Sequence, residues 1–413
     1  MSVSVFRRDS CRLCGGHDLE LVLQLAPTPI ADDYVSMDRV DEVQKTYPLD
    51  LYLCLSCGHV QLAHVVDPEA LYGEYIYLTL TSPGLVEHFR RYADALMRCV
   101  NLSQGAFVVD IGSNDGTLLR FFQEREMRVL GIDPAREIAR RATESGIETL
   151  PSYFTSGLAR RIRQERGPAA LVTANNVFAH ADALASMADG VRELLASGGV
   201  FVFEVSYLVD IVQKLLFDTI YHEHLCYHSV KPLDSFFPRH GMQLIDVQRI
   251  PSKGGSLHGT VQLAGGPRPV SPSVAELIAL EASLGLDRPA PFKALATQLD
   301  SIKTRLLSLL NGLKAEGKTI AGYGASATVT TLIYHFDLGD MVTFLVDDNP
   351  RKHNTFSPGH YIPVLPSDAI YERDADYVLI LAWRYAEPIM KKHQAFLDEG
   401  GHFIVPMPSV EVI

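Results

Sequence analysis

The sequence predicts an α/β chain in which a small N-terminal metal-binding module is followed by two Rossmann-like domains. Three observations support this prediction. Two C-x-x-C pairs lie near the N-terminus, an apolar run ending in Asp110 leads into a glycine-rich turn and a helical pattern, and a second run of this kind begins at Thr319. Alternating strand and helix patterns are typical of parallel sheets covered by helices. With 413 residues, the chain is long enough for two or three domains.

Composition and charge describe an ordinary globular protein and argue against some classes of partner. The hydrophobic fraction is 47%, the charged fraction is 21%, and the net charge is −12. Because there is no long basic run, we expect no nucleic-acid partner. No apolar run approaches the roughly 20 residues that span a membrane, and the first residues lack the apolar core of a secretory signal. We therefore expect a cytoplasmic protein with no membrane partner.

The N-terminal module is defined by two cysteine pairs, Cys11 with Cys14 and Cys54 with Cys57, each followed by glycine. Each pair brings two thiolates to one point, and two pairs complete a tetrahedral set of four sulfurs. With four ligands and no open position, the expected metal is structural Zn²⁺. A redox role for one C-x-x-C motif does not explain two pairs, which leaves free core cysteines as the alternative. Residues 15–53 exceed a common zinc-ribbon loop, so they must hold an insertion.

The residues from Val108 to Leu119 predict a site for a nucleotide cofactor. They read as a strand, a small-residue turn and the start of a helix, whose free N–H groups can bind a ligand. The next strand pattern ends in Asp133, where a carboxylate can accept hydrogen bonds from a ribose. Two cofactors, NAD and S-adenosylmethionine (SAM), fit this description.

The spacing of the turn favours SAM. An NAD fingerprint, G-x-G-x-x-G, seats a pyrophosphate on the helix, whereas this turn has only two glycines with Asn114 and Asp115 between them. Asp110 and Asp115 would repel a pyrophosphate but suit a sulfonium cofactor that has no phosphate. An ordinary strand–turn–helix crossing without a ligand is the remaining alternative. The cofactor-binding residues that we expect are Tyr77, Asp110, Gly112, Asn114, Asp115, Gly116, Asp133, Pro134, Asn175 and Asn176.

The strands that follow predict a methyltransferase type of sheet rather than a dehydrogenase sheet. Five strand patterns alternate with helices, near 106–110, 128–132, 147–150, 170–174 and 199–204. Two later runs, 242–250 and 256–263, read as an antiparallel pair that closes a seven-stranded sheet. Because ligands bind at the carboxyl ends of parallel strands, we expect Asn175, Asn176 and His180 to face the site.

A tyrosine-rich stretch lies before the helix that we expect from Leu85 to about Cys99. Tyr72, Tyr75 and Tyr77 could each be packing residues. As a cluster that precedes the cofactor strand, they could instead form a lid over cofactor and substrate.

The segment 217–229 gathers ionisable side chains in succession, Tyr221, His222, Glu223 and His224 among them. The pattern H-E-H could suggest a metal, but it lacks the histidine spacing of H-E-x-x-H. An acid/base cluster fits better, because histidine titrates near neutrality, a carboxylate can orient it, and a tyrosine can donate to an oxyanion. A polar loop with structural hydrogen bonds is the alternative.

The C-terminal part begins at a proline-rich linker near residue 270. Helical patterns over 274–284 and 292–316 precede a strand and turn with Gly322 and Gly324. Further strands are expected before Asp347, from Tyr377 to Arg384, and near 402–406. The glycines could bind phosphate, or the domain could serve only for packing. We thus divide the chain into a zinc-binding domain (1–70), a cofactor domain (71–268) and a C-terminal domain (269–413).

Taken in order, these motifs resemble the sugar C-methyltransferases of deoxysugar biosynthesis. The resemblance rests on the cysteine pairs, D-I-G-S-N-D-G, A-N-N-V-F-A-H, Y-H-E-H, and G-Y-G-A with V-D-D-N-P, and it covers essentially the whole chain. It implies a SAM-dependent enzyme that methylates C3 of a dTDP-linked 4-keto-deoxysugar used for bacterial natural products such as antibiotics. It also implies that the C-terminal domain helps to hold the nucleotide sugar.

The same resemblance implies roles for individual residues. His224 matches the base that removes a proton beside the sugar ketone. Tyr221 and Glu223 match the rest of that motif, His180 matches a strand-end histidine, and Tyr75 matches a lid tyrosine. This chain departs from the family pattern at Thr-Leu-Thr-Ser, where serines are usual, and at His222 inside the motif.

Three alternatives remain open at this stage. Methylation at C5 follows the same chemistry, because C5 also flanks the ketone. A bifunctional enzyme would in addition reduce the ketone with NADPH bound in the C-terminal domain. A zinc-dependent scaffold without catalysis would not bind SAM at all.

Overall fold

The computed structural model describes residues 4–73, 78–81 and 83–413 and groups the chain into two compact units. The first unit combines Met1–Glu20, Leu53–Val209 and Leu225–Arg288, and the second combines Leu21–Tyr52, Asp210–His224 and Pro289–Ile413. Each unit is therefore discontinuous in sequence, and each is described by itself. The division into 1–70, 71–268 and 269–413 follows chain order and stays a prediction.

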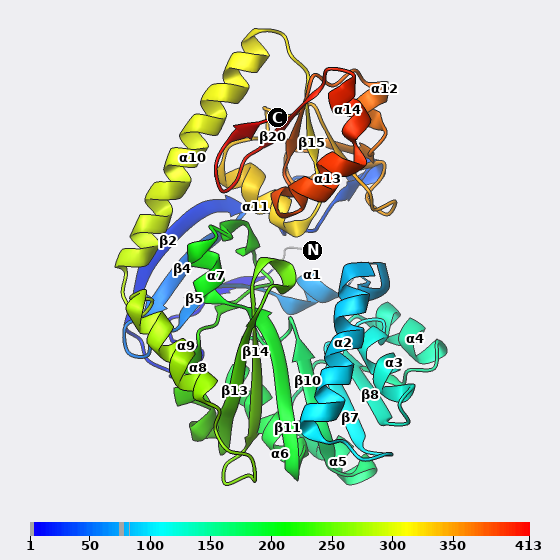
Figure 1. Ribbon diagram of the computed structural model, residues 1–413, viewed down its shortest axis with the longest axis vertical. Coiled ribbons are helices and arrows are strands. Elements are labelled where there is room, and N and C mark those ends of the chain that lie inside the picture. Colours follow the sequence, from blue (N-terminus) through cyan, green and yellow to red (C-terminus); the bar gives the residue numbers. More distant parts are fainter. Residues whose placement is uncertain (1–3, 74–77, 82) are drawn as a thin grey trace. The chain divides into compact units, whose positions relative to one another are not determined.

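A seven-stranded sheet forms the centre of the first unit, in the order β13-β14-β11-β10-β7-β8-β9 (Figure 1). Its strands are β7 (Phe107–Ile111), β8 (Arg128–Asp133), β9 (Thr149–Pro151), β10 (Ala169–Asn175), β11 (Leu195–Ser206), β13 (Met242–Ile250) and β14 (Ser256–Leu263). The first five run parallel, and β14 pairs antiparallel with both β11 and β13. The predicted methyltransferase type of sheet is confirmed, although β11 begins four residues earlier than expected.

The core of this sheet follows from the period-two alternation of its strands. Val200 and Val202 point to the same face and pack against Phe89, Tyr92 and Leu96 of helix α2 (Pro83–Val100). Those three helix residues recur every three or four positions, which places them on one face of α2. In Figure 1, α2 lies along this sheet with α3 (Thr117–Gln123) beside it. The remaining helices of this unit are α1 (Pro68–Tyr72), α4 (Arg136–Glu144), α5 (Ser156–Arg166), α6 (Leu184–Leu194), α8 (Val230–Phe236) and α9 (Pro272–Ser283).

The cysteine-rich part of the first unit has short strands that join distant segments. β1 (Val5–Arg7) pairs with β6 (His64–Val66), and β5 (Val60–Leu62) pairs with β12 (Cys226–Tyr227). Both cysteine knuckles close as tight turns: Gly15 donates to the carbonyl of Cys11 and Gly58 to that of Cys54. Each of these glycines has a positive φ, which explains why glycine follows each cysteine pair.

An eight-stranded sheet forms the second unit, in the order β21-β20-β19-β15-β16-β18-β17-β3. Its strands are β3 (Val35–Ser36), β15 (Ile320–Tyr323), β16 (Phe344–Asp347), β17 (Thr355–Phe356), β18 (Pro363–Pro366), β19 (Tyr377–Ile380), β20 (His402–Val405) and β21 (Glu411–Val412). The strands β15, β16, β18, β19 and β20 pair in parallel, as a Rossmann-like domain requires. The predicted strand from Tyr377 ends at Ile380, and Trp383 begins a 3-10 turn instead.

The insertion between the cysteine pairs contributes to this second sheet. It contains β2 (Leu19–Thr28), β3 and β4 (Tyr47–Cys54), and β2 pairs with β4. Strand β3 pairs antiparallel with β17, so it forms the edge of the eight-stranded sheet. The insertion is therefore more than a loop held between two knuckles.

Helices of the second unit follow clear apolar patterns. The longest, α10 (Ala290–Ala315), buries an apolar residue every third or fourth position from Phe292 to Leu313. The others are α11 (Ala327–His335), α12 (Ala369–Glu372), α13 (Ala386–Lys392) and α14 (Gln394–Asp398), while α7 (Leu208–Gln213) precedes the Phe217–Thr219 turn. Within the described part of the chain, no helix is both long and apolar enough to cross a membrane.

Candidate active site

The four cysteines predicted to bind zinc come together in the first unit. Their Sγ atoms all lie within 4.8 Å of one another, with Cys11 and Cys57 at 3.6 Å and Cys14 and Cys54 at 3.5 Å. A tetrahedral Zn²⁺ with Zn–S bonds of about 2.3 Å separates its sulfurs by about 3.8 Å. The arrangement fits a closed four-sulfur zinc site.

The predicted cofactor loop follows β7 and is shaped by its own glycines. Gly112 and Gly116 both have a positive φ, which glycine adopts without strain. A Cβ on Gly112 would overlap the side chain of Val177, and a Cβ on Gly116 would press on Ile147. These glycines are needed for the turn and for close packing.

Carboxylates surround this loop. Asp133 accepts hydrogen bonds from the backbone N–H groups of Asn114 and Ala135, both at 2.9 Å. Asp115 accepts from Thr117 and so begins α3, while the backbone N–H groups of Thr79 and Leu80 donate to Asn114 and Asp115 at 2.9 and 2.8 Å. The segment after the predicted lid is thereby fixed to the loop.

The charge of this loop fits a cationic cofactor. Burial raises the pKa of Asp110 to about 7, and burial also raises the pKa of Asp133. Among the described residues, no lysine or arginine forms an ion pair with Asp110, Asp115 or Asp133. Unpaired carboxylates repel a pyrophosphate and attract an ammonium or sulfonium group. The residues present therefore fit SAM better than NAD.

Polar groups also gather at the ends of β10 and β11. The amide atoms of the Asn175 side chain are buried and interact with the hydroxyl of Tyr92. Asn176 adopts a positive φ and donates its N–H to the carbonyl of Glu204 at 2.7 Å. The buried Glu204 carboxylate contacts His88 at 2.7 Å. Burial pushes the pKa of Glu204 up, but His88 together with Ser252 and His258 holds it below its usual value.

His180 lies on the loop that follows β10. Its N–H donates to the carbonyl of Val177 at 2.8 Å, and its ring stacks on Tyr72, with the ring planes 11° apart and the centroids 6.2 Å apart. This loop also carries Asn176 and Asp182, so a strand end predicted to face a ligand does hold several polar side chains.

Tyr75 and Tyr77, the predicted lid and cofactor tyrosines, lie outside the described residues.

The predicted acid/base segment belongs to the second unit. The Nδ1 of His224 lies 2.7 Å from the carbonyl oxygen of Thr219, and the rings of Tyr221 and His224 lie 4.1 Å apart. A carbonyl oxygen can only accept, so Nδ1 must carry the proton and Nε2 keeps its lone pair in the neutral ring. Burial, reinforced by the charge of Glu223, raises the pKa of Tyr221 well above its usual value. Tyr221 therefore stays a hydrogen-bond donor at any ordinary pH.

Neighbouring contacts fix this segment to the second unit. Asp218, which is buried, accepts from the Trp383 indole at 3.0 Å and from the Arg384 guanidinium at 2.7 Å. Thr331 of α11 donates to the carbonyl of Ile220 at 2.9 Å. His222 contacts the carbonyl of Tyr47 at 3.2 Å, which ties it to the insertion.

Sequence reasoning did not identify several of these contacts. Nothing in the sequence marks Thr219 as the partner of His224, because the contact is made by a backbone atom. Asp218 stands only three residues before Tyr221, so its position was a usable signal, whereas Arg384 is distant in sequence. His88 lies on the amphipathic helix α2, and its position in the sequence gives no sign of its contact with Glu204.

The glycine turn of the C-terminal sheet has packing contacts of its own. A Cβ on Gly324 would meet Ala382, and a Cβ on Gly322 would meet Leu345 and Leu381. Asp347 ends β16, and its carboxylate accepts from the backbone N–H groups of Ala325 and Asn349, both at 2.7 Å. These contacts give the turn a structural role, and the binding of NADPH stays a prediction.

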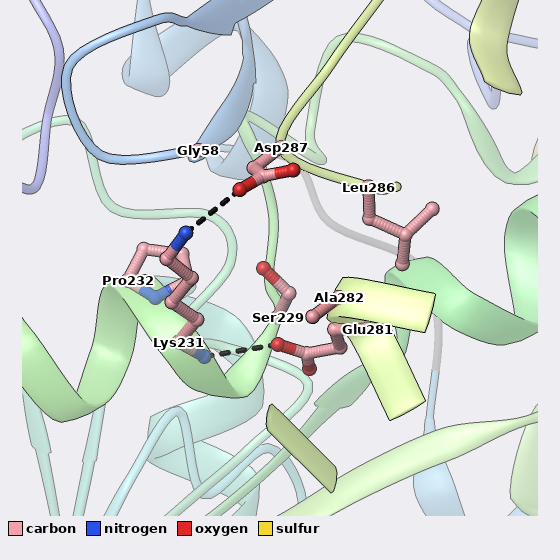
Figure 2. A pocket seen from close by; sticks show the side chains of 8 residues that line it. All are labelled: Gly58, Ser229, Lys231, Pro232, Glu281, Ala282, Leu286 and Asp287. Carbon is pink, nitrogen blue, oxygen red and sulfur yellow. Dashed lines mark hydrogen bonds and ion pairs between the residues drawn. The ribbon is translucent and has the colours of Figure 1, made fainter. Parts of the chain in front are cut away.

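A small pocket lies elsewhere in the first unit (Figure 2). Glu281 reaches it from α9 and accepts from the backbone N–H groups of Val230 and Lys231, at the start of α8. Lys231 forms an ion pair with Asp287 at 2.7 Å. None of the predicted site residues lines this pocket, and Glu281, Lys231 and Asp287 are already engaged in these contacts.

Comparison with known proteins matches the chain from one end to the other. Three family models match in succession: "Putative zinc binding domain" over residues 11–72, "Methyltransferase domain" over 86–247 and "C-methyltransferase C-terminal domain" over 251–408. C-methyltransferase NovU of Streptomyces niveus is 35% identical over 406 residues, which cover 98% of this chain and 97% of NovU.

Solved structures resemble this chain only in part. An S-adenosylmethionine-dependent methyltransferase from Clostridium acetobutylicum matches 44% of this chain and 92% of its own, at 13% identity and a TM-score of 0.36. The CcbJ methyltransferase from Streptomyces caelestis matches 48% of this chain and 96% of its own, at 13% identity and a TM-score of 0.35. These scores are too low to add to the argument.

Proposed function

The chain belongs to the C-methyltransferase family, and from this premise we propose that it methylates C3 of a dTDP-linked 4-keto-deoxysugar with SAM. The enzyme class, a SAM-dependent C-methyltransferase, follows from the family. The proposal adds the substrate, the methylated carbon and the roles of the residues. Its proposed setting is the synthesis of a branched deoxysugar for a natural product.

Methylation at a carbon atom requires that this carbon first be made nucleophilic. An unactivated sugar carbon is not nucleophilic, so a methyl group can be added only where a proton can first be removed. A ketone at C4 acidifies the hydrogen on C3, because the resulting negative charge moves to the carbonyl oxygen. The enzyme then needs a base near C3 and a donor near that oxygen. Bound SAM supplies the electrophilic methyl group.

The contact between His224 and the Thr219 carbonyl is the observation that carries the proposal. It fixes the neutral tautomer in which Nε2 carries no proton and can act as a base, and it would stabilise the imidazolium that forms when Nε2 takes the C3 proton. We assign His224 as this base. Glu223 orients it or carries a second proton.

Tyr221 is the proposed donor to the enolate oxygen. Its raised pKa keeps the hydroxyl protonated, and its ring lies 4.1 Å from that of His224. Tyr75 is the second proposed donor, and His180 is proposed to position the sugar. Donors placed where charge develops stabilise the transition state more than the ground state.

Other residues are proposed to bind the cofactor, the metal and the nucleotide part of the substrate. Asp110, Gly112, Asn114, Asp115, Gly116, Asp133, Pro134, Asn175, Asn176 and Tyr77 are the proposed SAM ligands. The four cysteines are proposed to hold structural Zn²⁺, and the C-terminal domain is proposed to help hold the dTDP group. No observation favours the ketoreductase function over a single methyl transfer.

Product analysis tests this proposal. The purified enzyme is incubated with SAM and a panel of dTDP-4-keto-deoxysugars, and the products are examined by mass spectrometry and by NMR for the methylated carbon. We expect one added methyl group, at C3, and no turnover with His224→Asn, which keeps an N–H near Thr219 but has no base in place of Nε2. The matched control His402→Asn removes an exposed histidine of the same unit and should leave turnover unchanged. A methyl group on C5 would move the assignment to that carbon.

A further inference from the structure

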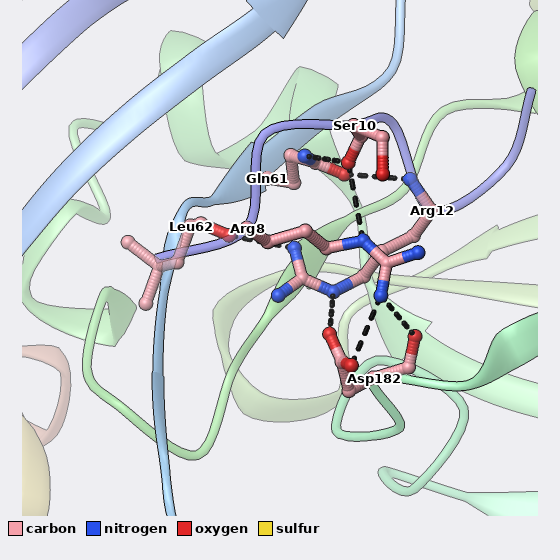
Figure 3. A network of polar contacts seen from close by, with 6 residues as sticks. All are labelled: Arg8, Ser10, Arg12, Gln61, Leu62 and Asp182. Carbon is pink, nitrogen blue, oxygen red and sulfur yellow. Dashed lines mark hydrogen bonds and ion pairs between the residues drawn. The ribbon is translucent and has the colours of Figure 1, made fainter. Parts of the chain in front are cut away.

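The loop after β10 is held by a network that begins inside the first cysteine knuckle (Figure 3). Arg12 stands between Cys11 and Cys14 and is only 4% exposed. Its Nε donates to one carboxylate oxygen of Asp182 at 3.0 Å, and Arg8 donates to the other at 3.0 Å. Asp182 lies two residues after His180, so this network joins the knuckle to the loop of a proposed site residue.

The position of Arg12 is fixed from several directions. Its side chain also donates to the carbonyl of Leu62 at 2.6 Å, and its backbone N–H donates to the Gln61 amide oxygen at 2.9 Å. Gln61 donates in turn to the carbonyl of Ser10 at 3.0 Å. A planar guanidinium held at a carboxylate and a carbonyl cannot shift without breaking both contacts. The position of Asp182 therefore depends on the conformation of the knuckle, through Arg12.

Other residues near the cysteine pairs hold the same loop. His59, two residues after Cys57, stacks on His228 with ring centroids 5.4 Å apart, and His228 contacts the carbonyl of Phe178 at 3.4 Å. Strand β5 pairs with β12, whose Cys226 donates to the carbonyl of Ala179 at 3.0 Å. The loop thus receives contacts at Phe178 and Ala179 besides those at Asp182.

The ring of His180 is contacted from the same part of the unit. It stacks on Tyr72, the last residue of α1, at 6.2 Å between centroids. These contacts reach the loop before, at and after His180, and they come from α1, from the segments around the cysteine pairs and from β12, which pairs with β5. The loop that carries His180 is therefore linked to the cysteine pairs on both sides of this residue.

We propose that Arg12 and Asp182 are positioning residues through which the zinc-bound knuckle sets the orientation of His180. This inference rests on the proposed function of His180 at the sugar. It gives the metal module a role in the geometry of the active site, since loss of zinc frees the knuckle, releases Arg12, and lets residues 176–182 move. The conformation of that loop should consequently depend on the metal.

Backbone hydrogen exchange tests the link without any substrate. Exchange of residues 176–182 is followed by mass spectrometry in the zinc-loaded enzyme, in the chelated enzyme and in zinc-loaded Asp182→Ala. We expect at least tenfold faster exchange of this loop in the last two, with the zinc content of Asp182→Ala unchanged. The control Glu148→Ala removes an exposed ion pair with Arg166 in the same unit and should leave the loop unaffected. Unchanged exchange in Asp182→Ala, or loss of its zinc, would overturn the proposal.

A double-mutant cycle then tests whether Asp182 acts through His180. If it does, Asp182→Ala lowers kcat, and the double variant with His180→Ala is no slower than His180→Ala alone, because the two changes remove one function. Additive losses would mean that Asp182 acts independently and would overturn the positioning role. Asp182→Asn, which keeps the shape and one acceptor, should show a smaller effect in the same direction. Absence of sugar methylation in the wild type would refute the proposed function, whereas the exchange experiment would still decide the link.

Discussion

Asp110 predicts a pH dependence of cofactor affinity. Its side chain is 4% exposed and accepts a hydrogen bond from Thr173 at 2.6 Å. Burial, opposed by this hydrogen bond and reinforced by the charge of Asp133, raises its pKa to about 7. At pH 7 about half of the molecules therefore carry a protonated Asp110. Binding of an ammonium group favours the ionised form, so it must release the proton.

The magnitude follows from linkage. If the ligand binds only the ionised form, its apparent Kd rises by a factor of 1 + 10^(pKa − pH), which is about 11 at pH 6 and about 1.1 at pH 8 for the pKa of about 7. S-adenosylhomocysteine should thus bind about tenfold more weakly at pH 6 than at pH 8. At pH 7, binding should release about half a proton per ligand.

The raised pKa of Asp110 also predicts how the stability of the fold changes with pH. The pKa of Asp110 in the folded protein lies above the unfolded value of 3.8, so the folded protein binds the extra proton between these two values. The contribution of Asp110 to stability therefore falls as the pH rises through that window. Replacement by asparagine should remove this slope.

Isothermal titration calorimetry measures these quantities. Titrations with S-adenosylhomocysteine at pH 6, 7 and 8, in two buffers of different ionisation enthalpy, give the affinity and the number of protons released. Asp110→Asn should bind S-adenosylhomocysteine with an affinity that no longer changes between pH 6 and pH 8. Equal affinity at pH 6 and pH 8, or a pH dependence that survives in Asp110→Asn, would refute the reasoning.

Three further predictions concern other parts of the molecule. Tyr221→Phe should lower kcat about 100-fold with little change in KM, because it removes a donor used mainly in the transition state; equal kcat in a steady-state assay would exclude that role. Cys54→Ser should reduce zinc in metal analysis from one ion per chain to a small fraction, and retained zinc would contradict the four-sulfur site. Gly112→Ala should weaken S-adenosylhomocysteine binding, since it adds a clash with Val177 to a positive φ. Adding Val177→Ala should restore only part of the affinity; full recovery would show that φ strain is unimportant.

The main sheet could be predicted because its strands carry strong local signals. Apolar runs such as Val108–Ile111 end in small or acidic residues, and the antiparallel pair β13 and β14 has the bounds expected from sequence. Strand β3 could not be found this way. It has only two residues, and it is a strand because it pairs with β17, more than 300 positions later. A two-residue strand is too short to show the alternation of apolar and polar residues that predicts longer strands.

The candidate site was predictable at the level of motifs and not of contacts. The four cysteines and the carboxylates around Gly112 were marked by residue type and spacing. The partner of His224 is a carbonyl, and the partner of Asp182 is Arg12, 170 positions away. Contacts of this kind depend on tertiary structure, so neither the tautomer of His224 nor the link to the zinc knuckle could be read from local sequence.

Deuterium exchange into the sugar tests the central claim most directly. The enzyme is incubated in D₂O with a dTDP-4-keto-deoxysugar and S-adenosylhomocysteine, which cannot transfer a methyl group, and the sugar is followed by NMR. We predict that the C3 hydrogen is replaced by deuterium with the wild type and retained with His224→Asn. Retention of the C3 hydrogen with the wild type, or equal exchange with His224→Asn, would contradict enolate formation by His224.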